Sequence, residues 1–155
     1  MSRIAKIKFK DGLWQIVEIS GEGSHVESET THKIYEEPHP DLPAALAGLV
    51  SHAREILEWP TSYADNRVRI TGVSFSHSED TGVEGAVITG FVDLDTSDSP
   101  FSFNTPHLPF EQYKEGNTAK LMPDGAIDAL ENLRTEAAKF LKGKRAQGNL
   151  FERAA

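Results

Sequence analysis

Cysteine is absent from this chain. Its absence excludes disulfide scaffolds, zinc sites with thiolate ligands and thiol nucleophiles, and it suits a reducing compartment. A chain of 155 residues buries enough surface for a core without such cross-links, because the buried fraction of surface rises with chain length. We therefore expect a single domain over residues 1–145, a short tail over residues 146–155 and a cytoplasmic location.

Long apolar runs are absent as well. The first ten residues alternate lysines with Ile4, Ile7 and Phe9, a pattern that is not typical of a signal peptide. No stretch of the sequence stays apolar for the length that a membrane helix needs. We expect neither export by such a signal nor a membrane partner.

Positive charge is scarce, since 16 Lys and Arg stand against 24 Asp and Glu and the formal net charge is −8. This total argues against tight non-specific binding to nucleic acid, which relies on Lys and Arg that displace counterions from phosphates. It still leaves room for a local basic face. Between Arg69 and Lys114 there is no Lys or Arg, and the acids there are Glu79, Asp80, Glu84, Asp93, Asp95, Asp98 and Glu111.

The first third of the chain predicts three strands. The dipeptide Asp11-Gly12 tolerates the positive φ angles of a tight turn, so the residues before it and residues 13–19 after it indicate a hairpin. The stretch 25–35 is polar but contains valine, threonine, isoleucine and tyrosine, which predicts an exposed or edge strand.

A helix and a second group of strands follow. From Asp41, which we expect to be the N-cap, apolar residues recur at helical spacing until Trp59-Pro60. Residues 68–75, 83–94 and 101–103 then predict a three-stranded meander. Residues 104–122 show no clean period and predict a long surface connection, a kind of segment that often carries function.

A second helix is predicted near the C-terminus. It begins near Pro123-Asp124, carries one apolar stripe, and ends near Gly143, which suits a left-handed C-cap. The element order is therefore βββαβββα. This order predicts an α+β fold in which two amphipathic helices pack on an antiparallel sheet of about six strands.

No catalytic motif stands out. The segment Gly21-Glu22-Gly23 lacks the third glycine and the Lys-Ser/Thr pair of phosphate-binding loops, so we interpret it as a turn. The adjacent carboxylate pairs Glu36-Glu37 and Glu79-Asp80 are expected to stay solvated, whereas acid–base pairs need one desolvated member. There is no Gly-x-Ser-x-Gly elbow either. We expect no catalytic residue, so an enzyme is the less favoured class.

Metal and cofactor motifs are equally weak. The run Asp93, Asp95, Ser97 and Asp98 has calcium-loop spacing, but the glycine at the sixth position and the glutamate at the twelfth are missing. The six histidines match no metal motif, and His32 with His39 or His52 is the first set to test. We therefore expect no metal and no cofactor.

The tail contains the most informative pattern, Gln147-Gly148-Asn149-Leu150-Phe151. Two large apolar residues at the end of a tail need a docking surface, because exposing each one forgoes roughly 1.5–3 kcal/mol of burial free energy. The segment resembles the Gln-x-x-Leu-Phe form of the bacterial sliding-clamp-binding motif. Gly148 departs from the leucine preferred there, and Asn149 replaces the usual serine or aspartate.

This resemblance implies a role for three residues. The glutamine side chain, here Gln147, hydrogen-bonds in one subsite of the clamp, and Leu150 and Phe151 fill its apolar pocket. The alternative is that Leu150 and Phe151 pack on the protein's own sheet. Residues 137–151 also resemble the ends of small phage proteins, which implies a phage-encoded accessory protein of DNA replication or recombination.

Three functions remain open. The first is a replication adaptor whose tail binds a sliding clamp and raises the local concentration of its domain. The second is an acidic, DNA-mimicking or anti-defence inhibitor of a host nucleic-acid enzyme, and it is based on the acids of the middle block. The third is a single-stranded DNA-binding protein in which bases stack on exposed rings; the candidate rings are Trp14, Phe75, Phe91, Phe101 and Phe103.

Overall fold

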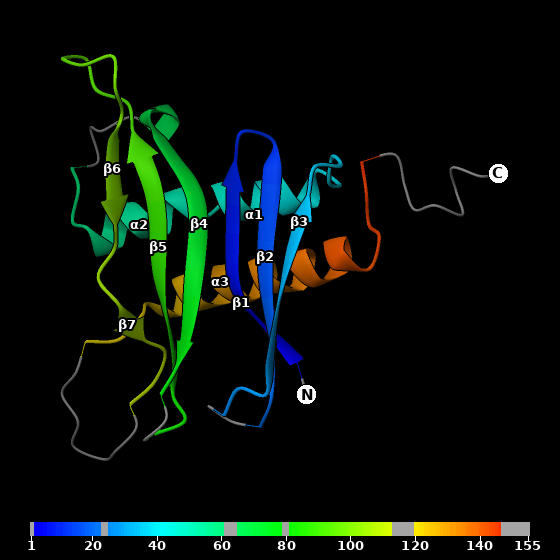
Figure 1. Ribbon diagram of the computed structural model, residues 1–155. Helices are drawn as coiled ribbons and strands as arrows, with labels where there is room; N and C mark the ends of the chain where they lie inside the picture. The colour runs from blue at the N-terminus through cyan, green and yellow to red at the C-terminus, as the bar shows by residue number, and fades with distance from the viewer. Residues whose placement is uncertain (1, 23–24, 61–64, 79–80, 113–119, 147–155) are drawn as a thin grey trace.

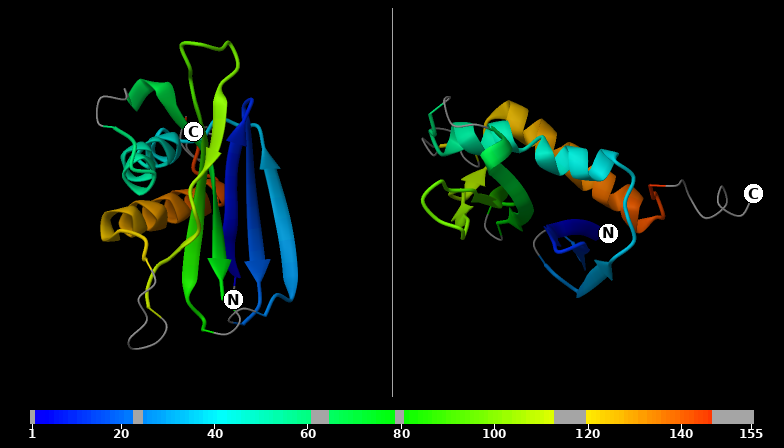
Figure 2. Two further views of the ribbon diagram at one scale, coloured as in Figure 1. Left: turned by 90° about the vertical axis from the view of Figure 1, so that its left-hand side faces the viewer. Right: turned by 90° about the horizontal axis from the view of Figure 1, so that it is seen from above.

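The computed structural model describes residues 2–22, 25–60, 65–78, 81–112 and 120–146 (Figure 1). These residues form a single antiparallel sheet with helices on one of its faces, as the views in Figure 2 show. The elements in chain order are β1 (Ser2–Lys10), β2 (Leu13–Ser20), β3 (Ser28–Ile34), α1 (Asp41–Ala47), α2 (Val50–Ile56), a 3-10 turn (Asp65–Arg67), β4 (Val68–His77), β5 (Glu84–Val92), β6 (Phe101–Asn104), β7 (Leu108–Pro109) and α3 (Asp124–Leu141).

The strand order across the sheet is β3-β2-β1-β4-β5-β6, and β7 also pairs with β5. Two hairpin groups, one from each half of the chain, therefore meet where β1 lies beside β4. The predicted α+β class and the antiparallel sheet are confirmed. The predicted hairpin turn is also confirmed, because Asp11 and Gly12 have φ angles of 51° and 79°.

Three predicted details are wrong. The first helix divides into α1 and α2, because Gly48 and Leu49 form a turn in which the Leu49 N–H donates to the Leu46 carbonyl. Asp41 is the first helical residue, and Pro40 occupies the N-cap without a side-chain hydrogen bond. The connection 104–122 contains the short strand β7.

The core lies between the sheet and the helices. Helix α3 contributes buried residues at helical spacing, among them Leu130, Leu133 and Phe140, each at most 1% exposed. The Phe140 ring meets Trp14 of β2 edge-on, with centroids 6.2 Å apart. The opposite face of the sheet carries no helix among the described residues (Figure 2). We call this the open face.

The end of α3 is fastened to the connection that precedes α1. Gly143 has a φ of 110°, as predicted for the helix end. After it, the Lys144 ammonium donates to the Asp41 carboxylate at 2.8 Å and to the Glu136 carboxylate at 3.0 Å. The Ala146 N–H donates to the Glu37 carbonyl. The root of the tail therefore has a fixed position beside α1.

Candidate functional site

The tail residues Gln147, Leu150 and Phe151 lie outside the described residues. The structure places only the root of the tail, at residues 144–146.

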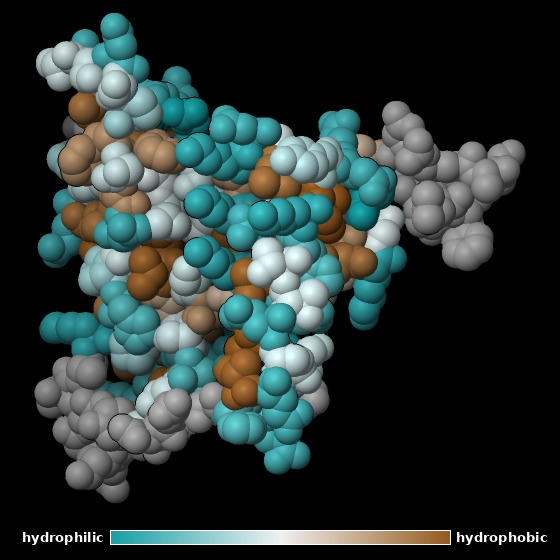
Figure 3. Space-filling model, viewed as in Figure 1, coloured by the Kyte–Doolittle hydropathy of each residue, from teal (hydrophilic) through white to brown (hydrophobic). Residues whose placement is uncertain are grey.

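A row of basic side chains lies on the open face of β1. Side chains alternate between the faces of a strand, and Ile7 points into the core, so Lys6 and Lys8 lie on the open face with Lys10 in the same row. Two other strands add basic residues to this face. Lys33 of β3 pairs with Gln15 of β2, which in turn pairs with Lys8. Arg69 belongs to β4. In Figure 3 this face carries hydrophilic side chains in teal beside apolar ones in brown.

A shallow groove of about 380 Å³ runs over this part of the sheet. We call it the seam groove, because it follows the junction between β1 and β4. Its outward-facing lining includes Lys6, Lys8, Lys10, Ser74, Thr89, Phe91, Ser102 and Asn104. Among the described residues that line it, none is acidic. In a chain of net charge −8, this is a local surface suited to an anion.

Gly72 forms part of the groove floor. It pairs with Lys8 on one side and Thr89 on the other, so a side chain there would project into the groove. A Cβ at this position would also come within 2.8 Å of the Ile7 carbonyl oxygen. The absence of a side chain at Gly72 allows β1 to lie close to β4, and it leaves the bottom of the groove unfilled.

The seam opens into a fork at each end. Strand β1 pairs with β4 only through residues 6–8 and 72–74. A register shift at Ala5 in β1 and another at Thr71 in β4 bend the two strands away from each other. The sheet is therefore continuous at its centre and divided at both ends.

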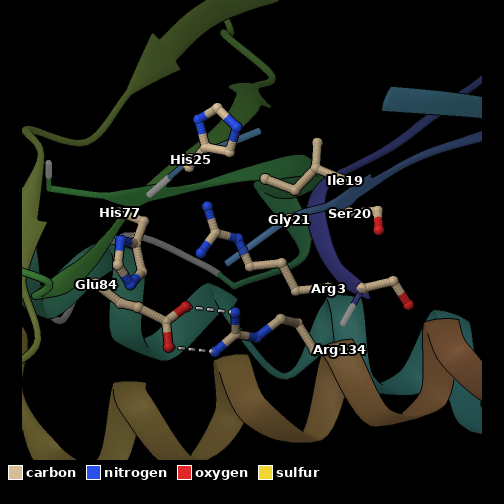
Figure 4. A pocket seen from close by; sticks show the side chains of 9 residues that line it. Arg3, Ile19, Ser20, Gly21, His25, His77, Glu84 and Arg134 are labelled. Atoms are coloured by element: carbon tan, nitrogen blue, oxygen red, sulfur yellow. Dashed lines mark hydrogen bonds and ion pairs between the residues drawn. The ribbon is translucent and has the colours of Figure 1, made fainter. Parts of the chain in front are cut away.

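One end of the seam is the charged fork, shown in Figure 4. Its cavity of about 290 Å³ is lined by Arg3, His25, His77, Glu84 and Arg134, together with small residues. Arg134 of α3 donates to Glu84 of β5 at 2.7 and 3.4 Å, and its guanidinium lies 4.4 Å from the centre of the Phe75 ring. This arrangement clamps α3 to β5.

The Arg134 guanidinium and the Glu84 carboxylate neutralise each other in the charged fork. Burial of Arg134 opposes its charge, but hydrogen bonds to Glu84 and Glu131 outweigh this and raise the pKa of the guanidinium. The only carboxylate among the described lining residues, Glu84, is thus already neutralised. The Nδ1 atom of His77 is buried without a partner among the described residues. We interpret this fork as a structural clamp.

The other end is the apolar fork, a cavity of about 510 Å³. Its walls come from the β1–β2 hairpin, β4, β5 and the helices α1 and α2. The apolar lining residues are Phe9, Trp14, Pro43, Leu46, Ala47, Val50, Val68, Ile70, Phe91 and Pro100, and Lys10, Asp11, Arg69 and Thr71 complete the lining. It shares Phe9, Lys10, Thr71 and Phe91 with the seam groove.

The candidate stacking rings are not equivalent. Trp14 and Phe103 are only 2% and 7% exposed, and Phe75 lies under Arg134 on the helix side. Phe91 is partly buried on the open face, beside Arg69 and Ser102. Phe101, at 57% exposed, lies at the start of β6. Of the five, Phe91 alone lines the seam groove from its outward side.

The histidines are spread over separate contacts. His32 lies 3.4 Å from a Glu18 oxygen, His39 contacts Asp41, and His52 packs against Gly125 at the start of α3. In the part of the chain that the structure describes, no three His, Asp or Glu residues are grouped as metal ligands would be.

The acids of the middle block are also divided. Among the five that are described, Glu84 pairs with Arg134, Asp93 with Arg69 at 3.0 Å, and Asp95 with Arg67. The other two, Asp98 and Glu111, are exposed. Glu79 and Asp80 lie outside the described residues. Three of the five described acids are neutralised by arginines and lie at the two ends of β5, which does not favour the phosphate-like array that DNA mimicry needs.

The row of lysines is a candidate functional feature that the sequence does not mark as a site. Its signal was present in residues 1–10, where lysines alternate with apolar residues, and such alternation gives a strand one basic face. The groove could not be predicted from the sequence, because two of its strands, β4 and β5, come from a distant part of the chain.

Within the described ranges, no helix has the length and apolar character needed to cross a bilayer. Comparison with known proteins gives no guide to the site: no family model, no curated protein and no solved structure matches this chain.

Proposed function

We propose that this is a non-enzymatic binding protein that holds single-stranded nucleic acid on the open face of its sheet. The observation that carries the proposal is the seam groove, which has three lysines of β1 in a row and no acid among its described lining residues. Successive lysines in that row are about 6.6 Å apart along the strand. An extended polyanion therefore meets several of them at once.

Phe91 favours a single strand over a duplex. Proteins that bind single strands without strong sequence preference combine a basic groove with rings on which bases stack. The hydroxyls of Ser74, Thr89 and Ser102 and the amide of Asn104 add hydrogen-bonding groups along the groove. The paired bases of a duplex are not free to stack on Phe91.

The test is a titration of a labelled single-stranded oligonucleotide, followed by fluorescence anisotropy at several salt concentrations. The double variant Lys6→Gln/Lys8→Gln removes two positive charges from the groove. It should weaken binding and reduce the slope of log K against log salt by about 0.7 for each phosphate that is no longer neutralised.

A charge-matched control is Lys120→Gln/Lys142→Gln, since neither lysine lines the groove. This control should bind as the unaltered protein does. Equal weakening in the two double variants, or no salt-sensitive binding by the unaltered protein, would contradict the proposal.

We propose a second activity for the tail, as a segment that binds a bacterial sliding clamp. The spacing of Gln147, Leu150 and Phe151 supports it, and the fixed root at residues 144–146 gives the tail a defined point of departure. Such a tether would raise the concentration of the domain near DNA. A purified clamp should retain the full chain but not the variant with alanine at all three positions; retention of both would contradict the assignment.

A further inference from the structure

The apolar fork lies at the end of the seam groove. The groove residues that also line the fork, Phe9, Lys10, Thr71 and Phe91, form the passage between them. We propose that the fork is a base-binding pocket that receives one base of the bound single strand. This inference rests on the proposed function and names the part of the ligand that the domain recognises.

The walls of the fork suit a flat aromatic ligand. Phe9 and Trp14 stack at a tilt with ring centroids 4.6 Å apart, and Phe91 contributes a third ring. Leu46, Val50, Val68 and Ile70 supply aliphatic surface from the helices and β4. Predominantly apolar cavities of this size with a few polar groups are typical small-molecule sites, and one base occupies part of such a volume.

Charge at the rim selects a base that is attached to phosphates. Lys10 and Arg69 lie on opposite sides of the fork, on β1 and β4, and Lys10 continues the row formed by Lys6 and Lys8. Arg69 is balanced by Asp93 at 3.0 Å, and Asp11 is the one acidic residue of the described fork lining. Lys6, Lys8 and Lys10 have no ion pair with another described residue, so the row adds positive charge along the groove. A backbone that follows the lysines can therefore place a base in the fork without leaving the basic surface.

The β4 main chain offers polar contacts inside the fork. Residues 68–71 of β4 have no pairing partner in β1, because the pairing of the two strands stops at Gly72. Main-chain N–H and C=O groups seek hydrogen-bond partners when they are covered. The edge of a base carries donors and acceptors that suit such a strand edge, whereas a purely aliphatic ligand does not.

Trp14 provides a direct probe of occupancy. In the Trp59→Phe variant, Trp14 is the remaining tryptophan, and the edge-on ring contact between position 59 and Phe103 is kept. A single-stranded oligonucleotide should change the Trp14 emission and bind about tenfold more tightly than an abasic strand with the same phosphates, since stacking contributes this much per base.

A pocket-filling variant tests the location. Ala47 is exposed and lines the fork, so Ala47→Phe should occupy the pocket without disturbing the core. Its affinity for the base-bearing strand should fall to that for the abasic strand. Ala44→Phe is the matched control, because Ala44 is exposed on the same helix but does not line the fork.

The outcomes separate the two proposals. If both strands bind equally and Ala47→Phe binds as Ala44→Phe does, the base pocket and the stacking on Phe91 are wrong, while binding of the phosphates by the groove lysines stands. If neither strand binds the unaltered protein, both proposals are wrong. A decrease of affinity in Ala47→Phe alone, restricted to the base-bearing strand, is the result we expect.

Discussion

At the scale of single residues, several glycines allow backbones and rings to approach closely. Gly90 of β5 is the clearest case. A Cβ at this position would lie 2.2 Å from the Arg69 carbonyl oxygen and 2.8 Å from the Phe103 ring. The first of these neighbours belongs to the main chain of β4, so it cannot give way by a change of rotamer.

We therefore expect Gly90→Ala to lower the free energy of unfolding by about 1–3 kcal/mol, the usual cost of overpacking. Urea denaturation followed by circular dichroism measures it. Gly48→Ala is the control, since its Cβ would make only ordinary contacts, 3.4 Å or longer, in a helical conformation that favours alanine. Equal stability of Gly90→Ala and the unaltered protein would show that β4 and β5 adjust freely.

Residue types also limited what the sequence could predict about the site. Five aromatic residues were candidates for stacking, and the sequence does not distinguish rings that face the core from rings that face solvent. Trp14 and Phe103 are core residues, whereas Phe91 is on the open face. Strand β5 has apolar residues on both faces, with Ala86, Ile88 and Val92 buried and Val87 and Phe91 only partly buried, so its hydrophobic pattern does not show which face meets the core.

At the scale of elements, apolar periodicity predicted most of the fold. The prediction failed where two consecutive helices continue the same helical spacing of apolar residues. Leu46, Leu49 and Ala53 are all buried at helical spacing, so the division between α1 and α2 leaves no trace in the pattern except Gly48. Residues 104–122 hid β7, because a two-residue strand is too short to show alternation.

The spacing of buried residues along β1 and β4 indicates the bulges that open the forks. Ile4 and Ile7 are buried three positions apart in β1, and so are Ile70 and Val73 in β4. A strand with period two cannot bury both members of such a pair on one face without an extra residue. The two bulges therefore follow from the burial of both members of each pair, and their meeting at one seam follows from the sheet order.

At the scale of the whole molecule, one ion-pair network joins distant parts of the chain. Lys144 lies between Asp41, which opens α1, and Glu136 near the end of α3. The hydrogen bond from Lys144 lowers the pKa of Asp41. For Glu136, burial opposes ionisation, but hydrogen bonds from Lys144 and Lys139 outweigh it and lower the pKa. The Asp41 and Glu136 hydrogen bonds raise the pKa of Lys144.

These shifts fix the sign of the pH dependence. A carboxyl group whose pKa is lower in the folded protein stabilises the fold above its ordinary pKa, here 3.8 for Asp41 and 4.5 for Glu136. That contribution to stability is lost as the pH falls through the lowered pKa values of the two carboxyl groups in the folded protein. The contribution of Lys144 is complete below its ordinary pKa of 10.5 and disappears as the pH rises beyond its raised value. The network therefore stabilises the domain from about pH 5 to about pH 10.

Lys144→Met removes the shared partner of both carboxylates while keeping much of the apolar stem. Its melting temperature should be below that of the unaltered protein at pH 7, and the difference should narrow towards pH 3, because protonated carboxyls no longer need the ammonium. Thermal unfolding followed by circular dichroism across this range measures the narrowing. Lys120→Met, at an exposed position with no ion pair found among the described residues, should show no such trend. A constant difference across the range for Lys144→Met would mean that the side chain stabilises the junction of α1 and α3 by packing instead of charge.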